Sequence, residues 1–163
     1  MEIERKFLVS REDCPVDLAT CTSIEMVQGY LSTSPVVRVR KEGDLWVLTY
    51  KSPGRMARQE ENLPLTPEAG EHLLGKADGY VIAKKRYLLP SGQTDPASGR
   101  ELTIELDLFE GEFDPLCYAE VEFDSVESAK GYTPPEWFGR EVTEEVGYSN
   151  SDLSKYGPPL EFK

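Results

Sequence analysis

Apolar and polar residues alternate at every second position along most of this chain. A period of two places successive side chains on opposite faces of a β-strand, whereas a helix repeats its apolar positions every three or four residues. The alternation predicts seven strands, at Glu2–Val9, Val36–Lys41, Leu45–Lys51, Arg58–Leu65, Tyr80–Leu89, Glu101–Phe109 and Tyr118–Phe123. A segment around Met26–Leu31 adds an eighth.

Few segments have helical character. Thr66–Ala77 opens with a threonine suited to an N-cap, followed by proline at the first helical position, and Ser125–Lys130 and Pro135–Phe138 are shorter candidates. Ser91–Arg100 is rich in Gly, Pro, Ser and Asp, which predicts an exposed hairpin loop. With no internal repeat and no linker, we expect residues 1–163 to form a single domain. The fold class we expect is α+β, an eight-stranded antiparallel β-barrel with helices packed outside.

Charged residues gather on one face of nearly every predicted strand. Glu2, Glu4 and Lys6 share a face of the first strand, with apolar residues on most of the other. Later strands place pairs of like charge two residues apart, at Arg38 and Arg40, Lys84 and Arg86, Glu105 and Asp107, and Glu120 and Glu122. Like-charged neighbours on one face repel each other. A cation held between carboxylates, or an anion held between guanidinium groups, would explain the pattern.

Two arrangements fit these strands: a half-buried sheet with its charged face in water, or a barrel with that face turned inward. In the barrel, seven acids would line the lumen, Glu2, Glu4, Glu60, Glu105, Asp107, Glu120 and Glu122. Seven bases would face them, Lys6, Arg38, Arg40, Lys51, Arg58, Lys84 and Arg86. Unpaired buried charges are very costly, so such a lumen must hold water, metal ions and a ligand.

Separate acidic and basic groups in one cavity suit a polyanion bridged to divalent cations. Arginine and lysine bind phosphate oxygens through charge-assisted hydrogen bonds. Carboxylates without His or Cys favour Mg²⁺ or Mn²⁺ over zinc. No Walker-type phosphate loop and no kinase signature is present in the sequence. If a triphosphate binds here, side chains must do what backbone amides do in a phosphate loop.

Overall charge and cysteine content narrow the partners and the compartment. The formal net charge of -12 disfavours nucleic acid or an anionic membrane as a partner. Cys14, Cys21 and Cys117 have no metal-site spacing, which indicates free thiols in a reducing compartment. We find no apolar run long enough to span a membrane and no signal peptide, so we expect a cytoplasmic protein.

The segment Glu2–Lys6 (EIERK) resembles the ExExK signature of the CYTH domain, the triphosphate tunnel metalloenzyme superfamily. The charged strands follow it in order: VRVRK at Val37–Lys41, LTYK at Leu48–Lys51, RQE at Arg58–Glu60, KKRY at Lys84–Tyr87, ELDLF at Glu105–Phe109 and EVEF at Glu120–Phe123. The similarity covers essentially the whole chain and is closest to the compact bacterial branch. It implies an eight-stranded tunnel with helices outside.

This resemblance also implies roles for individual residues. Glu2, Glu4, Glu120 and Glu122 match acidic positions linked to the metal, with Glu60, Glu105 and Asp107 as supports. The bases Lys6, Arg38, Arg40, Lys51, Lys84 and Arg86 match triphosphate-binding positions, with Arg58 as a further contact. Lys6, Glu4 and Tyr30 are the candidates for catalysis. Asn62 shares a face with Arg58 and Glu60, where similar proteins often have another acid.

The activity that the resemblance implies is metal-dependent hydrolysis of inorganic tripolyphosphate or of nucleoside triphosphates. Three alternatives stay open: an adenylate cyclase that releases pyrophosphate from ATP, a thiamine triphosphatase, and a polyphosphate or nucleotide binder without catalysis. The small-molecule triphosphate is the expected partner, and the apolar exterior of a barrel makes a homodimer reasonable. Tyr148–Lys155 is expected to close one mouth of the tunnel.

Overall fold

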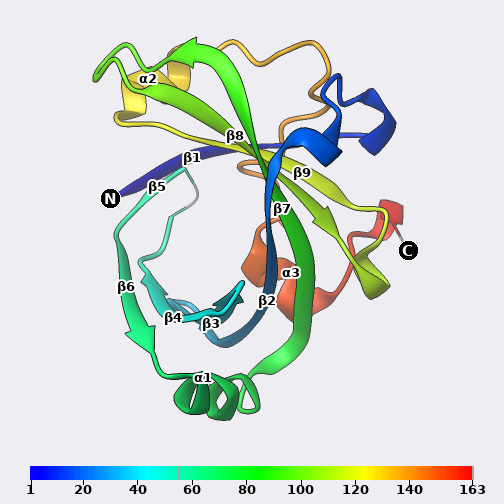
Figure 1. The fold of residues 1–163 in the computed structure, drawn as a ribbon. Helices are drawn as coiled ribbons and strands as arrows, with labels where there is room; N and C mark the ends of the chain where they lie inside the picture. Colours follow the sequence, from blue (N-terminus) through cyan, green and yellow to red (C-terminus); the bar gives the residue numbers. More distant parts are fainter. Residues whose placement is uncertain (55, 163) are drawn as a thin grey trace.

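Nine antiparallel strands form the sheet in the computed structural model, which describes residues 1–54 and 56–162. The strands are β1 (Glu2–Leu8), β2 (Thr22–Thr33), β3 (Val36–Glu42), β4 (Leu45–Lys51), β5 (Ala57–Arg58), β6 (Glu60–Leu65), β7 (Asp78–Thr94), β8 (Glu101–Phe109) and β9 (Cys117–Glu122). Their order is β5-β1-β9-β8-β7-β2-β3-β4-β6. Figure 1 shows them curling into a ring. The predicted antiparallel barrel is confirmed.

One short segment, which includes β5 and β6, connects the two edges of the sheet and closes the barrel. β5 pairs with β1, β6 pairs with β4, and only Gln59 separates β5 from β6. The backbone of Gln59 exchanges hydrogen bonds with Ser52, since its carbonyl accepts from the Ser52 N–H at 2.9 Å and its N–H donates to Ser52 Oγ at 2.8 Å. These local bonds divide the single strand predicted at Arg58–Leu65, so eight expected strands become nine.

Three α-helices accompany the sheet: α1 (Pro67–Leu74), α2 (Val126–Gly131) and α3 (Asn150–Tyr156). Single 3₁₀ turns lie at Arg11–Asp13, Leu18–Thr20, Gly111–Phe113 and Leu160–Phe162. α1 packs on β2, β3 and β4, where Gly70 lies against the Trp46 ring so closely that a Cβ atom would clash. α2 packs on β1, and α3 packs on β2 and β7. No helix in the described part of the chain could cross a membrane.

Two predictions of secondary structure were wrong, and one helix was not predicted. Pro135–Phe138 is not a helix but one turn, because the neighbouring prolines lack N–H groups and only the Phe138 N–H bonds back to Pro135. Ser91–Arg100 is not all loop, because β7 continues to Thr94 and pairs with Glu101 at the start of β8. The helix α3 was not predicted; Ser149 caps it by accepting from the Asp152 N–H at 3.0 Å.

Apolar side chains form two clusters, on either side of the sheet. The first covers the outer face of β1, β8 and β9 and contains Ile3, Phe7, Ile104, Leu106, Ala119 and Val121, under α2 and the segment around Phe138. The second contains Ile82, Phe109, Phe113, Leu116, Tyr118, Val142, Tyr148 and Leu153. Tyr118 shares its strand face with Glu120 and Ile82 shares its face with Lys84, so this second cluster lies on the same side of the sheet as the charges.

Candidate active site

The charged face of the sheet turns inward, as the barrel arrangement requires. Nine of the predicted charged side chains are buried: Glu2, Lys6, Arg38, Arg40, Lys51, Lys84, Arg86, Asp107 and Glu120. Glu4, Arg58, Glu60 and Glu105 are half-buried, and Glu122 is exposed. A sheet with its charged face in water would leave most of these side chains exposed, so that alternative is excluded.

Two cavities run along this inner face. One, of about 300 Å³, is lined by both acids and bases: Glu2, Glu4, Arg38, Arg40, Glu42, Lys51, Glu60, Arg86, Glu105, Glu120 and Glu122, with Val47, Asn62 and Asn150. The other, of about 360 Å³, has Lys6 and Arg58 in its wall, together with Thr143 and the start of α3. Glu4 lines both cavities, so it stands where they adjoin.

The wall formed by β1 and β9 is acidic. Glu4 pairs in register with Glu122, and Lys6 pairs with Glu120, whose carboxylate lies 3.8 Å from Lys6 Nζ. Burial, together with the charges of Glu120 and Glu2, raises the pKa of Glu4 to about 8 against the attraction of Lys51 and Lys6. Glu4 therefore lies among more negative charge than the nearby cations offset.

The opposite wall, on β3, is basic. Arg38 donates to Thr49 Oγ1 at 3.3 Å, while its buried Nε atom has no hydrogen-bond partner. Arg40 donates from Nε to Gln28 Oε1 at 2.7 Å and lies 3.3 Å from Glu42. Burial, together with the charges of Arg38 and Arg86, lowers the pKa of Arg40 to about 10. On this wall the positive charges outnumber the nearby acids, and the buried Nε–H of Arg38 has no acceptor. Both features favour an anion as the ligand.

A first ion-pair network joins β1 to the segment that closes the barrel. Lys51 lies 2.9 Å from one oxygen of Glu2, and Arg58 lies 3.1 Å from the other. Lys51 also pairs with Glu60 at 3.3 Å. Burial opposes ionisation of Glu2, yet these two cations hold the pKa of its carboxyl group well below the usual value. Glu2 is therefore ionised and held in place.

A second network joins β7 to β8. Arg86 binds both oxygens of Asp107, with Nε to Oδ1 at 2.7 Å and Nη2 to Oδ2 at 2.9 Å, and its Nη1 reaches Glu105 at 2.9 Å. Lys84 Nζ lies 2.7 Å from the same Asp107, and neither side chain is accessible to water. Against burial, the two cations keep the pKa of Asp107 well below its usual value. Asp107 therefore holds two bases in fixed positions.

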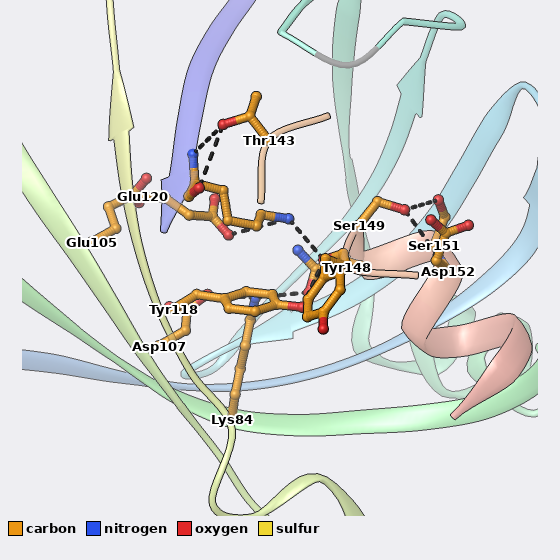
Figure 2. A network of polar contacts seen from close by, with 12 residues as sticks. Lys84, Glu105, Asp107, Tyr118, Glu120, Thr143, Tyr148, Ser149, Ser151 and Asp152 are labelled. Carbon is orange, nitrogen blue, oxygen red and sulfur yellow. Dashed lines mark hydrogen bonds and ion pairs between the residues drawn. The ribbon is translucent and has the colours of Figure 1, made fainter. Parts of the chain in front are cut away.

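Aromatic rings underlie both lysines. Lys6 Nζ stands 4.9 Å from the centre of the Tyr118 ring, and Lys84 Nζ stands 5.4 Å from that of Phe109. The two rings pack edge to face with centres 5.1 Å apart. Tyr118 donates from its hydroxyl group to the Tyr148 carbonyl at 2.7 Å, and Lys6 Nζ donates to the same oxygen at 3.5 Å (Figure 2). Each lysine ammonium group therefore lies within cation–π distance of an aromatic ring.

The acidic wall suits a hard divalent cation. Its donors are all oxygen atoms, Oε1 of Glu120 is buried without a hydrogen-bond partner, and Glu4 has no ion pair within the described ranges. Nevertheless, no three acids among the described residues are already arranged around one point. Glu2 faces Lys51 and Arg58 instead, so an incoming cation would compete with them.

Tyr30 and Asn62 lie outside the buried set of charged side chains. Tyr30 does not line either charged cavity; its buried side chain lines a third one of about 250 Å³ with Asp78 and Lys155. Its predicted role in catalysis stays a prediction. Asn62 is exposed at the rim, where it donates to Glu60 at 2.9 Å and accepts from Thr49 at 2.6 Å.

Sequence reasoning missed several residues that contact the predicted bases. Gln28 holds Arg40, Tyr118 and the Tyr148 carbonyl hold Lys6, and Asn150 contacts Lys84 at 3.5 Å. The alternation in β2 carried a signal for Gln28, since it shares a face with Met26 and Tyr30. No local pattern marked Asn150, because the docking of α3 brings it to β7.

Comparison with known proteins gives a consistent answer. The CYTH domain family matches residues 1–156. A protein from Nitrosomonas europaea named "Inorganic triphosphatase" is 37% identical over 158 residues, which cover 94% of this chain and 96% of that protein. Another of that name, from Acetivibrio thermocellus, is 35% identical over 166 residues, covering 99% and 97% respectively.

Solved structures agree in fold. A crystal structure of an inorganic triphosphatase matches with a TM-score of 0.66 and 34% identity, and the match covers 98% of this chain and 97% of that one. A candidate adenylyl cyclase from Hippeastrum, whose structure is described as revealing a dominant triphosphatase activity, matches with a TM-score of 0.67. It is 17% identical, with 100% of this chain and 99% of that one covered, so it supports the fold alone.

Proposed function

Because the chain belongs to the CYTH domain family, we propose that it hydrolyses a triphosphate inside its barrel, with inorganic tripolyphosphate as the preferred substrate. One observation carries the proposal. The arginines of β3 and the carboxylates of β1 and β9 face each other across the same cavity of about 300 Å³. A polyanion bound to the basic wall and a divalent cation bound to the acidic wall would neutralise the charge on each.

The basic side chains bind and orient the phosphates. Arg38 and Arg40 offer N–H donors from β3, and Lys51 and Arg86 line the same cavity from β4 and β7. Lys6 and Arg58 extend this set into the adjoining cavity. Buried Lys84 shares Asp107 with Arg86, and burial with the charges of Arg86 and Arg40 lowers its pKa to about 7. Because Asp107 and Glu2 already fix several of these bases, little reorganisation is needed when charge develops on the leaving diphosphate.

The acidic side chains would hold Mg²⁺ or Mn²⁺. Glu2, Glu4, Glu120 and Glu122 are the proposed ligands, while Glu60, Glu105 and Asp107 orient the neighbouring bases. When bound, the cation would supply positive charge to the phosphate oxygens and lower the pKa of a water molecule beside them. Glu4 would give up its proton to the solvent before it binds the cation. Tyr30 is kept as a candidate for catalysis, acting from the adjacent cavity.

The lining of the cavities favours an inorganic substrate over a nucleotide. In the described part of the chain, neither charged cavity has a Phe, Tyr or Trp side chain in its wall. A nucleobase or a thiazolium ring commonly binds against such a side chain. Trp46 packs against α1 and Trp137 against Phe138 instead. Adenylate cyclase and thiamine triphosphatase activities therefore lack a visible binding platform.

A substrate panel tests the proposal. Tripolyphosphate, pyrophosphate, ATP and thiamine triphosphate should be incubated with the protein in Mg²⁺ and in Mn²⁺, and all products identified. Release of phosphate and pyrophosphate from tripolyphosphate at the highest kcat/KM is expected. Cyclic AMP with pyrophosphate from ATP would instead show a cyclase, and tight binding with no turnover in either metal would show a binder without catalysis.

Location and assembly are further parts of this proposal. A cytoplasmic location is supported by three free cysteines, of which Cys117 is buried. A homodimer is supported by the apolar side chains left exposed on the outer face of β4 and β6, where Tyr50 is 39% and Leu63 is 57% exposed. Sedimentation of the purified protein over a range of concentrations would test the assembly.

A further inference from the structure

Asn150 is the one α3 side chain that lines the cavity holding the arginines and the acids. It is the first residue of α3 and shares that cavity with Arg38, Arg40 and Arg86. Figure 2 shows its neighbours Ser149 and Ser151 next to Tyr148, whose carbonyl accepts a hydrogen bond from Tyr118. A neutral amide therefore stands among the bases proposed to bind phosphate.

The orientation of this amide follows from its contact with Lys84. The Lys84 ammonium lies 3.5 Å from Asn150 Oδ1 and can only donate hydrogen bonds. The amide oxygen must therefore face Lys84, and the NH₂ group must point the other way. Nδ2 donates to no acceptor within residues 1–54 and 56–162. Two N–H donors are thus directed away from Lys84 in the wall of the cavity.

The position of Asn150 is held by the packing of α3. Leu153 is fully buried in the second apolar cluster, and Ser149 caps the helix. Gly79 of β7 lies against the Ser154 carbonyl so closely that a Cβ atom would clash. These contacts fix the start of α3, and with it the backbone of Asn150, before any ligand arrives. Fixing a donor in advance reduces the entropy lost on binding.

We propose that Asn150 contacts the substrate, donating an N–H from Nδ2 to a phosphate oxygen beside Lys84 and Arg86. An amide adds a donor there without adding a fourth cation near Arg40, Lys84 and Arg86, whose charges already repel one another. The identity of the anion rests on the proposed function, whereas the contact between an anion and the amide is a separate claim.

Two substitutions separate contact with the anion from mere support of Lys84. Asn150→Ala removes both interactions. Asn150→Asp keeps an oxygen for Lys84, and an acid suits the first turn of a helix, but the NH₂ group is lost and a negative charge faces the anion. Gln93→Glu, on the exposed end of β7, adds the same charge away from the cavity and is the matched control.

Binding of sodium tripolyphosphate should be measured by titration calorimetry in buffer with EDTA, where no metal-dependent turnover occurs. We expect the affinity to fall about 10-fold in Asn150→Ala, since a hydrogen bond to a charged group is lost. The loss should exceed about 100-fold in Asn150→Asp, and Gln93→Glu should bind like the wild type. Circular dichroism would show that all variants are folded.

The contact is overturned if Asn150→Asp binds within about twofold of the wild type, or more tightly than Asn150→Ala. Hydrolysis measured in parallel keeps the two proposals apart. If the variants bind as expected but the wild type releases no phosphate in Mg²⁺ or Mn²⁺, the proposed function fails and the contact stands. If the wild type hydrolyses tripolyphosphate and Asn150→Asp binds normally, only the contact fails. A wild type that does not bind tripolyphosphate contradicts both.

Discussion

Glu4 and Glu120 project into one cavity from the neighbouring strands β1 and β9, and burial together with the charge of Glu120 raises the pKa of Glu4 to about 8. Without a cation, ionised Glu4 is therefore a destabilising group in the folded protein. A divalent cation between the two carboxylates would reverse that effect. The stability of the metal-free protein should therefore depend on the ionisation of Glu4.

Glu4→Gln is expected to stabilise the metal-free protein at pH 8. The folded pKa of Glu4 is raised above its unfolded value of 4.5, so wild-type stability falls as the pH rises from about 4.5 towards 8. Below pH 4.5 both states are protonated, and the gain should vanish. Thermal unfolding in EDTA should show a melting temperature about 2–4 °C higher in the variant at pH 8.

Glu61→Gln is the control for this substitution, because Glu61 lies on the exposed face of β6. Its melting temperature should follow the wild type at every pH. Adding Mn²⁺ should raise the melting temperature of the wild type more than that of Glu4→Gln. A Glu4→Gln variant that is less stable than the wild type in EDTA at pH 8 would contradict this account.

Asp107→Asn should be strongly destabilising. The substitution leaves Lys84 and Arg86 buried without their shared carboxylate, and breaking a buried ion pair from one side costs about 3–5 kcal/mol. Urea unfolding at pH 7 would measure the loss. Asp44→Asn, at the exposed turn between β3 and β4, should leave the free energy of unfolding unchanged. A loss below about 1 kcal/mol in Asp107→Asn would show that the bases find other partners.

Much of this lumen could be predicted from the sequence because a strand alternates its faces with a period of two. That rule placed Glu2, Glu4 and Lys6 on one face without any knowledge of their neighbours. It could not predict that Arg86 would bind Asp107, since cross-strand register depends on turns and bulges elsewhere in the sheet.

The helix α3 escaped prediction for a different reason. It has seven residues, too few for a clear helical period, and tertiary packing stabilises it. The contact between Asn150 and Lys84 joins residues 66 positions apart in the sequence. Tyr148–Lys155 contacts Lys6 and Lys84, and its expected role in closing a mouth of the tunnel stays a prediction. The sequence could not show that Asn150 would make the contact with Lys84.

Tyr118 should act on Lys6 through two separable features, its hydroxyl group and its ring. Tyr118→Phe removes the hydrogen bond to the Tyr148 carbonyl and should cost about 1 kcal/mol of stability, with little change in KM. Tyr118→Leu also removes the ring beneath the ammonium and should raise KM several-fold. Urea unfolding and steady-state kinetics would measure both effects. Equal KM values in the two variants would contradict a role for the ring.

The three thiols should differ in reactivity. Cys117 is 1% exposed, and burial raises the pKa of its thiol to about 12, so it should resist alkylation in the folded protein. Cys14 and Cys21 are half-buried and should react. Mass spectrometry after iodoacetamide treatment at pH 8 should find at most two labels in the native protein and three in urea. Fast labelling of Cys117 in the native state would show that the first apolar cluster, which contains Cys117, opens to solvent.

The most direct test of triphosphate hydrolysis at the acidic wall is phosphate release from tripolyphosphate by Glu4→Gln. The variant keeps the size of the side chain but removes a carboxylate from the point where the two cavities adjoin. With folding verified and Glu61→Gln as the control, we expect Glu4→Gln to lose at least about 100-fold in kcat/KM in Mg²⁺ and in Mn²⁺, a loss of about 2.7 kcal/mol in transition-state stabilisation. Full metal-dependent phosphate release by the folded variant would contradict the account.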